Sequence, residues 1–351
     1  MRYENKAMQM AAPLEALGRI MMLLAVLSLT GLASANTDIR MHTTHAGSSP
    51  YVFSVTLQSV LQKNLPVDIN MTAGMASTRS TLDASKGQVD FFIGAPSINH
   101  FMSSGTGMFA SMERAPELYK NVRQVMNFPL GPYHIMVHAD SGITELKQIK
   151  GKRVFIGPPG GAATLVALSI IEGATGYKPG EDYKMAKLDW GSGAQAFQDG
   201  QVDLYIGPTE LPSASIEQLV LLQKVRFLGI PDEAMDSEPM KDVLSLPGRT
   251  IMQIPPDIYG DNQVNTEAVN TVGTWVSLGT HKDVDEDLVY QITKTIFENL
   301  QTFHAAARFM EAVNLDNALR QMNGKLHPGA LRYYREIGAD LPESAVPPEA
   351  E

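Results

Sequence analysis

The sequence predicts an α/β protein of two similarly built lobes, and three observations lead to this prediction. An apolar phrase occurs twice, as GQVDFFIG over Gly87 to Gly94 and as GQVDLYIG over Gly200 to Gly207, 113 positions later. A small-residue turn keeps the same offset, from Gly47-Ser48-Ser49-Pro50 to Gly160-Gly161-Ala162-Ala163. Strand-like and helix-like segments alternate along the chain, which is typical of a sheet covered by helices. The alternative is that Gly-x-Val-Asp is a common turn before a strand and recurs by coincidence.

The first lobe is expected to begin with a strand over 39–43 and a helix over 51–63. Apolar residues recur in that helix at helical spacing, and Ser49 followed by Pro50 is a favourable start. Strands over 67–71 and 89–94 and a helix over 77–85 follow. The apolar stretch 126–138, interrupted by Pro129 and Pro132, is interpreted as the crossover into the second lobe.

The same pattern then restarts. We expect strands over 151–156, 183–188 and 225–230, and helices over 162–175, before Gly200 and over 216–222. Extended segments over 250–254 and 272–278 lead back to the first lobe, and 288–303 is an amphipathic helix. Lobe one therefore comprises 36–135 plus 260–340, and lobe two 136–259. Residues 341–351 are rich in proline and acid, and we expect a disordered tail there.

Composition excludes several classes of function. The 351 residues carry a net charge of −10, so nucleic acid is not an expected partner. The chain has no cysteine, and its eight histidines show no metal-binding spacing. We therefore predict no metal, no cofactor and no disulfide, and we expect a monomer.

The N-terminus has the features of an export signal. Basic residues precede the apolar run of 13 residues from Ile20 to Leu32, and Ala33-Ser34-Ala35 follows as a small-x-small cleavage site. We expect a signal peptide over 1–35, cleavage after Ala35, and a periplasmic protein. The alternative, a membrane anchor, needs an apolar run of about 20 residues.

Four loops lie between a predicted strand and a predicted helix. Such loops present free backbone N–H groups and the positive end of a helix dipole, which favour a carboxylate or another anion. They are Gly47–Pro50, Gly74–Thr78, Gly160–Thr164 and Gly191–Gly193. Each could instead be only a tight turn. We expect them to face one cleft between the lobes.

Motifs of known chemistry are absent from these loops. The loop from Gly157 to Thr164 lacks the Gly-Lys-Ser/Thr ending of a nucleotide-binding loop, and no serine is framed as Gly-x-Ser-x-Gly. Glu210 is the one acid expected near the cleft, either as a solvated loop carboxylate or as a partner for a ligand ammonium group. His45 could bond a ligand or cap its turn. Arg79 could pair with a ligand carboxylate or lie on the outer face of its helix.

Several motifs in order resemble the TAXI-type solute receptors of tripartite ATP-independent periplasmic (TRAP) transporters. They are Asp140-Ser141-Gly142-Ile143, Lys150-Gly151-Lys152-Arg153-Val154, Gly157-Pro158-Pro159-Gly160, the run Asp287 to Lys294, and Leu326-His327-Pro328-Gly329-Ala330. The resemblance covers about residues 36–338. It implies a type II periplasmic-binding-protein fold, with a hinge and an interlobe cleft. It also implies a non-enzymatic receptor that delivers a small organic acid or amino acid to a sodium-driven membrane permease.

By position, the resemblance implies ligand contacts from six segments. They are Gly47, Ser48, Ser49 and Tyr51; Gly74, Ala76, Ser77 and Thr78; Ala95, Pro96 and Ser97; Gly160, Gly161, Ala162, Ala163 and Thr164; Thr209, Glu210 and Leu211; and Tyr259. Three segments depart from the family. Gly161-Ala162-Ala163-Thr164 replaces Gly-Ser-Gly-Thr, Thr209-Glu210-Leu211 replaces smaller residues before Pro212, and the first loop, at Gly47 to Ser49, lacks one of the usual glycines.

The family favours glutamate-like or 2-oxoglutarate-like ligands. An amino acid fits better if the Glu210 carboxylate faces the cleft, because that carboxylate would repel a simple dicarboxylate. Two alternatives stay open. One is a binding protein for an ATP-driven importer, and the other is an exported lyase or dehydratase with Glu210 as general acid.

Overall fold

The structure is a computed structural model that describes residues 36–350. The expected signal peptide over 1–35 lies outside the described residues. The chain divides into Met1–Thr37 and Asp38–Glu351, and the second unit carries the fold described below. Within 36–350, no helix combines the length and the apolar character that a membrane crossing requires.

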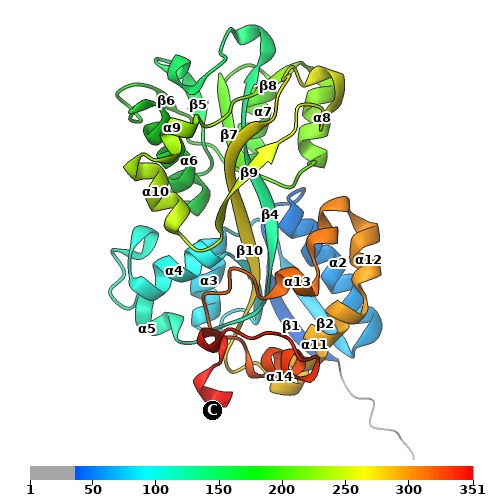
Figure 1. The fold of residues 1–351 in the computed structure, drawn as a ribbon. Coiled ribbons are helices and arrows are strands. Elements are labelled where there is room, and N and C mark those ends of the chain that lie inside the picture. The colour runs from blue at the N-terminus through cyan, green and yellow to red at the C-terminus, as the bar shows by residue number, and fades with distance from the viewer. Residues whose placement is uncertain (1–35, 351) are drawn as a thin grey trace, which may run out of the picture. The chain divides into compact units, whose positions relative to one another are not determined.

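Strands and helices alternate through most of the chain (Figure 1). The elements up to the first long strand are β1 (Thr37–His42), α2 (Ser49–Asn64), β2 (Val67–Thr72), α3 (Ser77–Ser85), β3 (Phe91–Gly94), α4 (Pro96–Ser104), α5 (Ala115–Tyr119) and β4 (Val122–His138). The next are β5 (Arg153–Phe155), α6 (Ala162–Thr175), β6 (Lys184–Met185), α7 (Trp190–Gln198), β7 (Leu204–Pro208), α8 (Ala214–Leu222), β8 (Val225–Phe227), α9 (Asp232–Met235) and α10 (Glu238–Ser245). The last are β9 (Arg249–Ile254), β10 (Val269–His281), α11 (Glu286–Glu298), α12 (Leu300–Ala306), α13 (Leu315–Ala318) and α14 (Pro328–Glu336).

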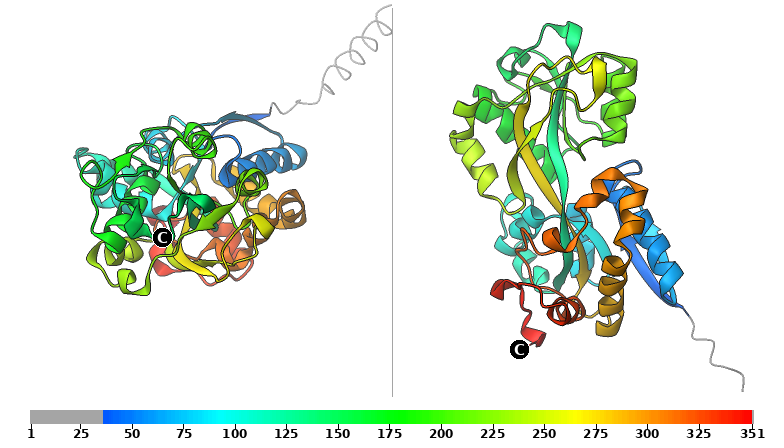
Figure 2. Two further views of the ribbon diagram at one scale, coloured as in Figure 1. Left: turned by 90° about the horizontal axis from the view of Figure 1, so that it is seen from above. Right: turned by 45° about the vertical axis from the view of Figure 1, so that its right-hand side comes forward.

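The strands form one hydrogen-bonded path in the order β2-β1-β3-β10-β4-β7-β5-β6, with β8 paired to β4 and β9 to β10. The long strands β4 and β10 are antiparallel neighbours and run side by side through the middle of the molecule (Figures 1 and 2). On one side of this pair lie the short strands β1 to β3, and on the other β5 to β7. Read from either end, the path therefore runs through three short strands and then reaches the long central pair.

The offset of 113 residues found in the sequence recurs in the pairing. Met41 pairs with Phe91 in the parallel strands β1 and β3, and Val154 pairs with Leu204 in the parallel strands β5 and β7. Helices α3 and α7 also begin 113 positions apart. Both repeated strands nevertheless belong to one continuous path rather than to two unconnected sheets.

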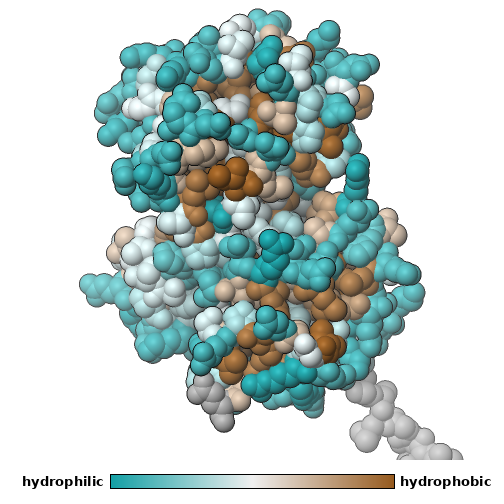
Figure 3. All heavy atoms as spheres, in the orientation of Figure 1, coloured by the Kyte–Doolittle hydropathy of each residue, from teal (hydrophilic) through white to brown (hydrophobic). Residues whose placement is uncertain are grey.

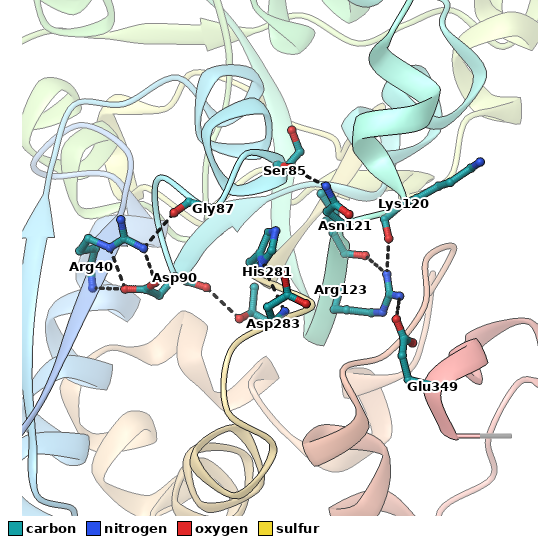
Figure 4. Close-up of polar contacts among 12 residues, drawn as sticks. Arg40, Ser85, Gly87, Asp90, Lys120, Asn121, Arg123, His281, Asp283 and Glu349 are labelled. Atoms are coloured by element: carbon teal, nitrogen blue, oxygen red, sulfur yellow. Dashed lines mark hydrogen bonds and ion pairs between the residues drawn. The ribbon is translucent and has the colours of Figure 1, made fainter.

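The aspartate of each repeated phrase makes an equivalent contact. The Asp90 carboxylate accepts a hydrogen bond from the backbone N–H of Arg40 at 2.8 Å, and the Asp203 carboxylate accepts one from the backbone N–H of Arg153 at 2.8 Å. In the first contact the Arg40 guanidinium also donates to Asp90, at 2.6 Å (Figure 4). Each aspartate therefore fixes the start of its strand against the neighbouring strand.

Helices cover both faces of the sheet, and the apolar core divides into clusters. One large cluster joins β1, β2 and β3 to α2, α11 and α14, and α3 and α4 pack on smaller clusters. Two other large clusters lie on β5 and β7. One packs α6 and α10 against these strands, and the other packs α7 and α8 against them. We call the part built on β1 to β3 the first half and the part built on β5 to β7 the second half. That the two halves move as lobes with the expected boundaries stays a prediction.

Some elements differ from the sequence-based expectation. The helix expected over 288–303 is interrupted at Asn299, which ends α11 and precedes α12. The strand expected over 183–188 is reduced to Lys184–Met185. Helix α4 begins at Pro96, in a segment interpreted only as a ligand loop.

The expectation of a disordered tail over 341–351 is wrong for residues 341–350. The Ala345 carbonyl accepts a hydrogen bond from the Leu326 N–H at 2.8 Å, and the Ala345 side chain is buried. The Glu349 carboxylate forms an ion pair with the buried Arg123 guanidinium (Figure 4). Composition alone could not predict this, because the buried Arg123 supplies the partner from a distant strand.

Candidate functional site

The two halves meet at the carboxyl ends of their short strands. Ser49 is the first residue of α2, after β1, and Glu210 follows β7. The Ser49 hydroxyl donates a hydrogen bond to the Glu210 carboxylate, although the residues are 161 positions apart. Both side chains are buried, Ser49 at 1% exposed and Glu210 at 7%. The structure therefore brings together two of the expected site residues, one from each half.

The Glu210 carboxylate has a second hydroxyl donor, and its described partners are hydroxyls rather than cations. Thr209 donates to the same carboxylate oxygen that Ser49 contacts. Among residues 36–350, no lysine, arginine or histidine forms an ion pair with Glu210. A buried carboxylate without a countercharge is costly, so this position suits a group that brings a positive charge.

Gly131 on β4 allows the Glu210 loop to approach the central strands. A Cβ at Gly131 would lie 2.2 Å from the Thr209 carbonyl oxygen and 2.9 Å from the Glu210 Cα. The φ of Gly131 is +138°, a conformation that favours glycine. The position of Glu210 therefore depends on a glycine in the central strand.

A chain of hydrogen bonds braces the same loop from behind. The Tyr259 hydroxyl bonds to the His134 Nε2 at 2.6 Å and accepts from the Ser213 N–H at 3.1 Å. The His134 Nδ1 lies 3.1 Å from the Pro132 carbonyl oxygen, so Nδ1 carries the proton and Nε2 accepts from Tyr259. Burial lowers the pKa of His134 to about 3, which keeps the ring neutral. The Tyr259 hydroxyl positions the loop that carries Glu210, and the expected contact between Tyr259 and the ligand stays a prediction.

Ser97, another expected residue, lies beside a buried arginine. Arg249, the first residue of β9, is 7% exposed and donates from Nη2 to the Ser97 hydroxyl at 3.0 Å. Its Nη1 donates to the Thr274 hydroxyl on β10. Ser97 is the second residue of α4, whose N-cap Ala95 supplies no side-chain hydrogen bond. Burial lowers the pKa of Arg249, as expected for a cation removed from water.

The remaining expected residues of the first half have mainly local roles. The Ser48 hydroxyl accepts from the Tyr51 N–H at 3.3 Å as the N-cap of α2, and it donates to the His45 carbonyl at 2.7 Å. The Gly74 N–H donates to the Thr44 carbonyl at 3.0 Å, which ties the loop after β2 to the loop after β1. Gly47 lies exposed at the tip of its turn, and Ala76, Ser77 and Thr78 form the start of α3, where no side chain caps the helix.

In the second half, Gly160 to Thr164 form the loop before α6 and its first turn. The Thr164 hydroxyl donates to the Pro158 carbonyl at 2.6 Å, so this hydroxyl is engaged within its own loop. Gly160 has a φ of +77°, and Gly161 caps α6 without a side chain. Ala162 and Ala163 follow on α6, and Ala162 packs on the cluster around α4 of the first half.

A shallow apolar groove of about 180 Å³ lies beside this contact, lined by Phe101, Ala162, Leu165, Val166, Ser169, Asp242, Val243 and Leu246. It contains neither Ser49, Glu210 nor Arg249. Figure 3 shows a largely hydrophilic surface with an apolar patch in the region where Figure 1 draws β9, whose Ile251 is 57% exposed. We place the candidate site at the buried polar contacts, because the groove is lined mainly by apolar side chains and the Asp242 carboxylate at its edge would repel a carboxylate ligand.

The structure bears on one further expected loop and on Arg79, for which two alternatives were open. The Asp189 carboxylate accepts from the Ser192 N–H at 2.8 Å and so caps α7, which removes Gly191–Gly193 as an anion-binding loop. Arg79 donates to Asp83 at 2.8 Å on the outer face of α3 and is 63% exposed, so it lies away from the site. His45 instead reaches across the halves, where its ring stacks on Trp190 with centroids 6.2 Å apart.

Sequence reasoning missed Arg249 and His134. An arginine at the start of a strand is ordinarily exposed, and nothing local in Pro247-Gly248-Arg249 indicates burial. His134 lies in an apolar run, which could have indicated a buried neutral histidine.

Comparison with solved structures shows the fold. The chain is similar to a structure described as a periplasmic transporter, with 15% identity, a TM-score of 0.50, and coverage of 87% of this chain and 94% of the other. It is also similar to a protein of Bordetella bronchiseptica RB50, at 13% identity and a TM-score of 0.47, covering 90% and 86%. A third similar structure is a TRAP periplasmic solute-binding protein of Shewanella oneidensis with bound succinate, at 8% identity and a TM-score of 0.46, covering 79% and 81%.

The predicted α/β fold with a central sheet, that of periplasmic solute-binding proteins, is confirmed. A comparison with protein families matches residues 41–338, which is most of the chain. The chain belongs to the NMT1-like family.

Proposed function

We propose that this protein is a periplasmic solute receptor of the TAXI type. It binds a small carboxylate or amino acid and delivers it to a TRAP-type membrane permease. The fold is shared with a structure described as a periplasmic transporter, which supports a role in binding and transport rather than catalysis. The TRAP assignment rests on the sequence resemblance over about residues 36–338.

The observation that carries the proposal is the buried contact between Ser49 and Glu210. It joins the carboxyl ends of strands from two repeated α/β halves, which is where open α/β sheets bind ligands. A ligand held there contacts both halves, and its binding favours their closed arrangement.

The surroundings of Glu210 favour an amino acid over a simple dicarboxylate. Ser49 and Thr209 contact one carboxylate oxygen, so the other retains its capacity to accept from an ammonium group. A dicarboxylate without a positive group would place like charges together in a buried site. The partners of Glu210 among the described residues are the Ser49 and Thr209 hydroxyls, and neither is an acid or base that ionises near neutral pH, which favours binding over lyase chemistry.

Native mass spectrometry of the purified protein, followed by calorimetry with L-glutamate, L-leucine, succinate and 2-oxoglutarate, tests the proposal. We expect one retained or added small molecule per chain, without turnover on incubation. Glu210→Gln should weaken amino-acid binding about 10- to 100-fold, because it removes a charge-assisted hydrogen bond. Glu217→Gln, on the exposed surface of α8, is the matched control. Unchanged amino-acid affinity in Glu210→Gln would remove Glu210 from the site, and turnover of the ligand would contradict a receptor.

A further inference from the structure

Arg249 is a buried cation whose described partners are neutral. Its guanidinium contacts two hydroxyls, those of Ser97 and Thr274, and within residues 36–350 its Nε has no hydrogen-bond partner. Among the residues that the structure describes, no aspartate or glutamate forms an ion pair with it. By contrast, the equally buried Arg123 has the Glu349 carboxylate as its partner. An uncompensated buried arginine is expensive, and a bound anion would compensate it.

The surroundings of Arg249 are also suited to an anion. Ser97 is the second residue of α4, a helix of nine residues whose amino end has no side-chain cap. Pro96 has no N–H, and the Ile98 and Asn99 N–H groups donate to the Ala95 carbonyl. The Ser97 N–H and the positive end of the helix dipole are therefore what attract negative charge at this end. The helix end is held against Arg249, since a Cβ at the adjacent Gly248 would lie 3.1 Å from the Pro96 side chain.

A second unpartnered polar group lies next to this helix end. Ser277 on β10 is 1% exposed, and its hydroxyl has no hydrogen-bond partner in the described part of the chain. It pairs with Gly94, the last residue of β3, and the Ser277 Oγ lies 3.0 Å from the place that a Cβ of Gly94 would take. Gly94 is separated from α4 only by Ala95. The unused hydroxyl is therefore directed at the end of β3, where the chain turns into the helix.

We propose that Arg249, Ser97 and the amino end of α4 bind the carboxylate of the receptor's ligand. This inference rests on the proposed function and names the chemical class that the site selects. A planar carboxylate offers two acceptor oxygens to the two N–H donors on one face of a guanidinium. A primary amide has one oxygen, and its NH₂ group is a donor that the guanidinium cannot accept from. Glu210, on the other half, is then left for a positive group of the same ligand.

The proposal is tested by calorimetry with matched pairs of ligands. The pairs are succinate with succinamide, L-glutamate with glutamic acid diamide, and L-leucine with L-leucinamide. We expect at least one carboxylate to bind and its amide to bind at least about 100-fold more weakly. Arg249→Lys should weaken the carboxylate about 10- to 100-fold, because lysine keeps the charge and loses the two-donor geometry. Arg123→Lys, at a buried arginine far along the chain, should leave the affinity unchanged.

The outcomes separate this inference from the proposed function. Full carboxylate affinity in folded Arg249→Lys and Arg249→Met, or equal binding of the amide, overturns the role of Arg249 while the receptor function stands. If Arg249→Met does not fold, Ser97→Ala takes its place, with an expected loss of several-fold. If the wild-type protein binds only neutral molecules, the proposed role of Arg249 is also overturned, while the receptor function stands. A wild-type protein that carries and binds no small molecule contradicts the proposed function itself.

Discussion

His134 should make the protein lose stability as the pH falls below about 6.5. Burial lowers the pKa of His134 from 6.5 to about 3, so the folded protein keeps this ring neutral where the unfolded chain protonates it. The unfolded state therefore binds more protons, and the free energy of unfolding decreases as the pH is lowered from 6.5 to about 3. Each pH unit below 6.5 costs about 1.36 kcal/mol, which gives about 2 kcal/mol at pH 5.

Urea denaturation of wild type and His134→Gln between pH 7 and pH 4 measures this contribution. The glutamine variant should be less stable at pH 7, because the bond to Tyr259 is altered, and its stability should fall less steeply toward pH 4. His327→Gln is the comparator, since burial lowers the pKa of His327 to about 4 and should add a separate contribution. Equal slopes in wild type and His134→Gln would refute a buried neutral His134.

Three further predictions concern the tail, the junction and the central strand. Glu349→Gln should lower the free energy of unfolding by about 1 to 2 kcal/mol at pH 7, measured by thermal or urea unfolding, because it leaves the buried Arg123 unpaired. Burial raises the pKa of Glu349, but hydrogen bonds from its own backbone and from Arg123 outweigh burial, so the net pKa is lowered. The cost of the substitution should therefore shrink below about pH 4.5, where the wild-type carboxylate begins to protonate. Ligand binding should change the fluorescence of Trp190, which stacks across the halves, and an undiminished change in Trp190→Phe would contradict this position. Gly131→Ala should cost about 3 kcal/mol and weaken ligand binding, since its Cβ would overlap a carbonyl oxygen; wild-type stability and affinity would count against the described loop.

The repeated phrase made most of the fold predictable from the sequence. Both copies place a glycine before the strand, with φ of +68° at Gly87 and at Gly200, and an aspartate that holds the next strand. The predicted helices over 77–85 and 162–175 match α3 and α6 in both bounds. Such elements are predictable because local hydrophobic periodicity and turn chemistry determine them.

The candidate site was predictable only in part. The Gly-rich loop Gly47–Pro50 indicated where Ser49 would lie, and the end of the second repeated strand indicated where Glu210 would lie, because segments at the carboxyl ends of strands share one edge of the sheet. The orientation of each hydroxyl was not predictable, since Thr164 bonds to its own loop and Ser49 bonds to the other half. The burial of Arg249 depends on the pairing of β9 with β10 and on the approach of α4, and both are tertiary contacts.

A crystal structure of the protein with its retained or added ligand tests the central claim most directly. The account predicts one small molecule at the junction of the halves, with a carboxylate within about 3 Å of the Arg249 guanidinium and of the Ser97 hydroxyl. An ammonium group, where the ligand has one, should lie within the same distance of the Glu210 carboxylate. A ligand held only in the apolar groove between α6 and α10, or one that contacts neither Arg249 nor Glu210, would contradict the account.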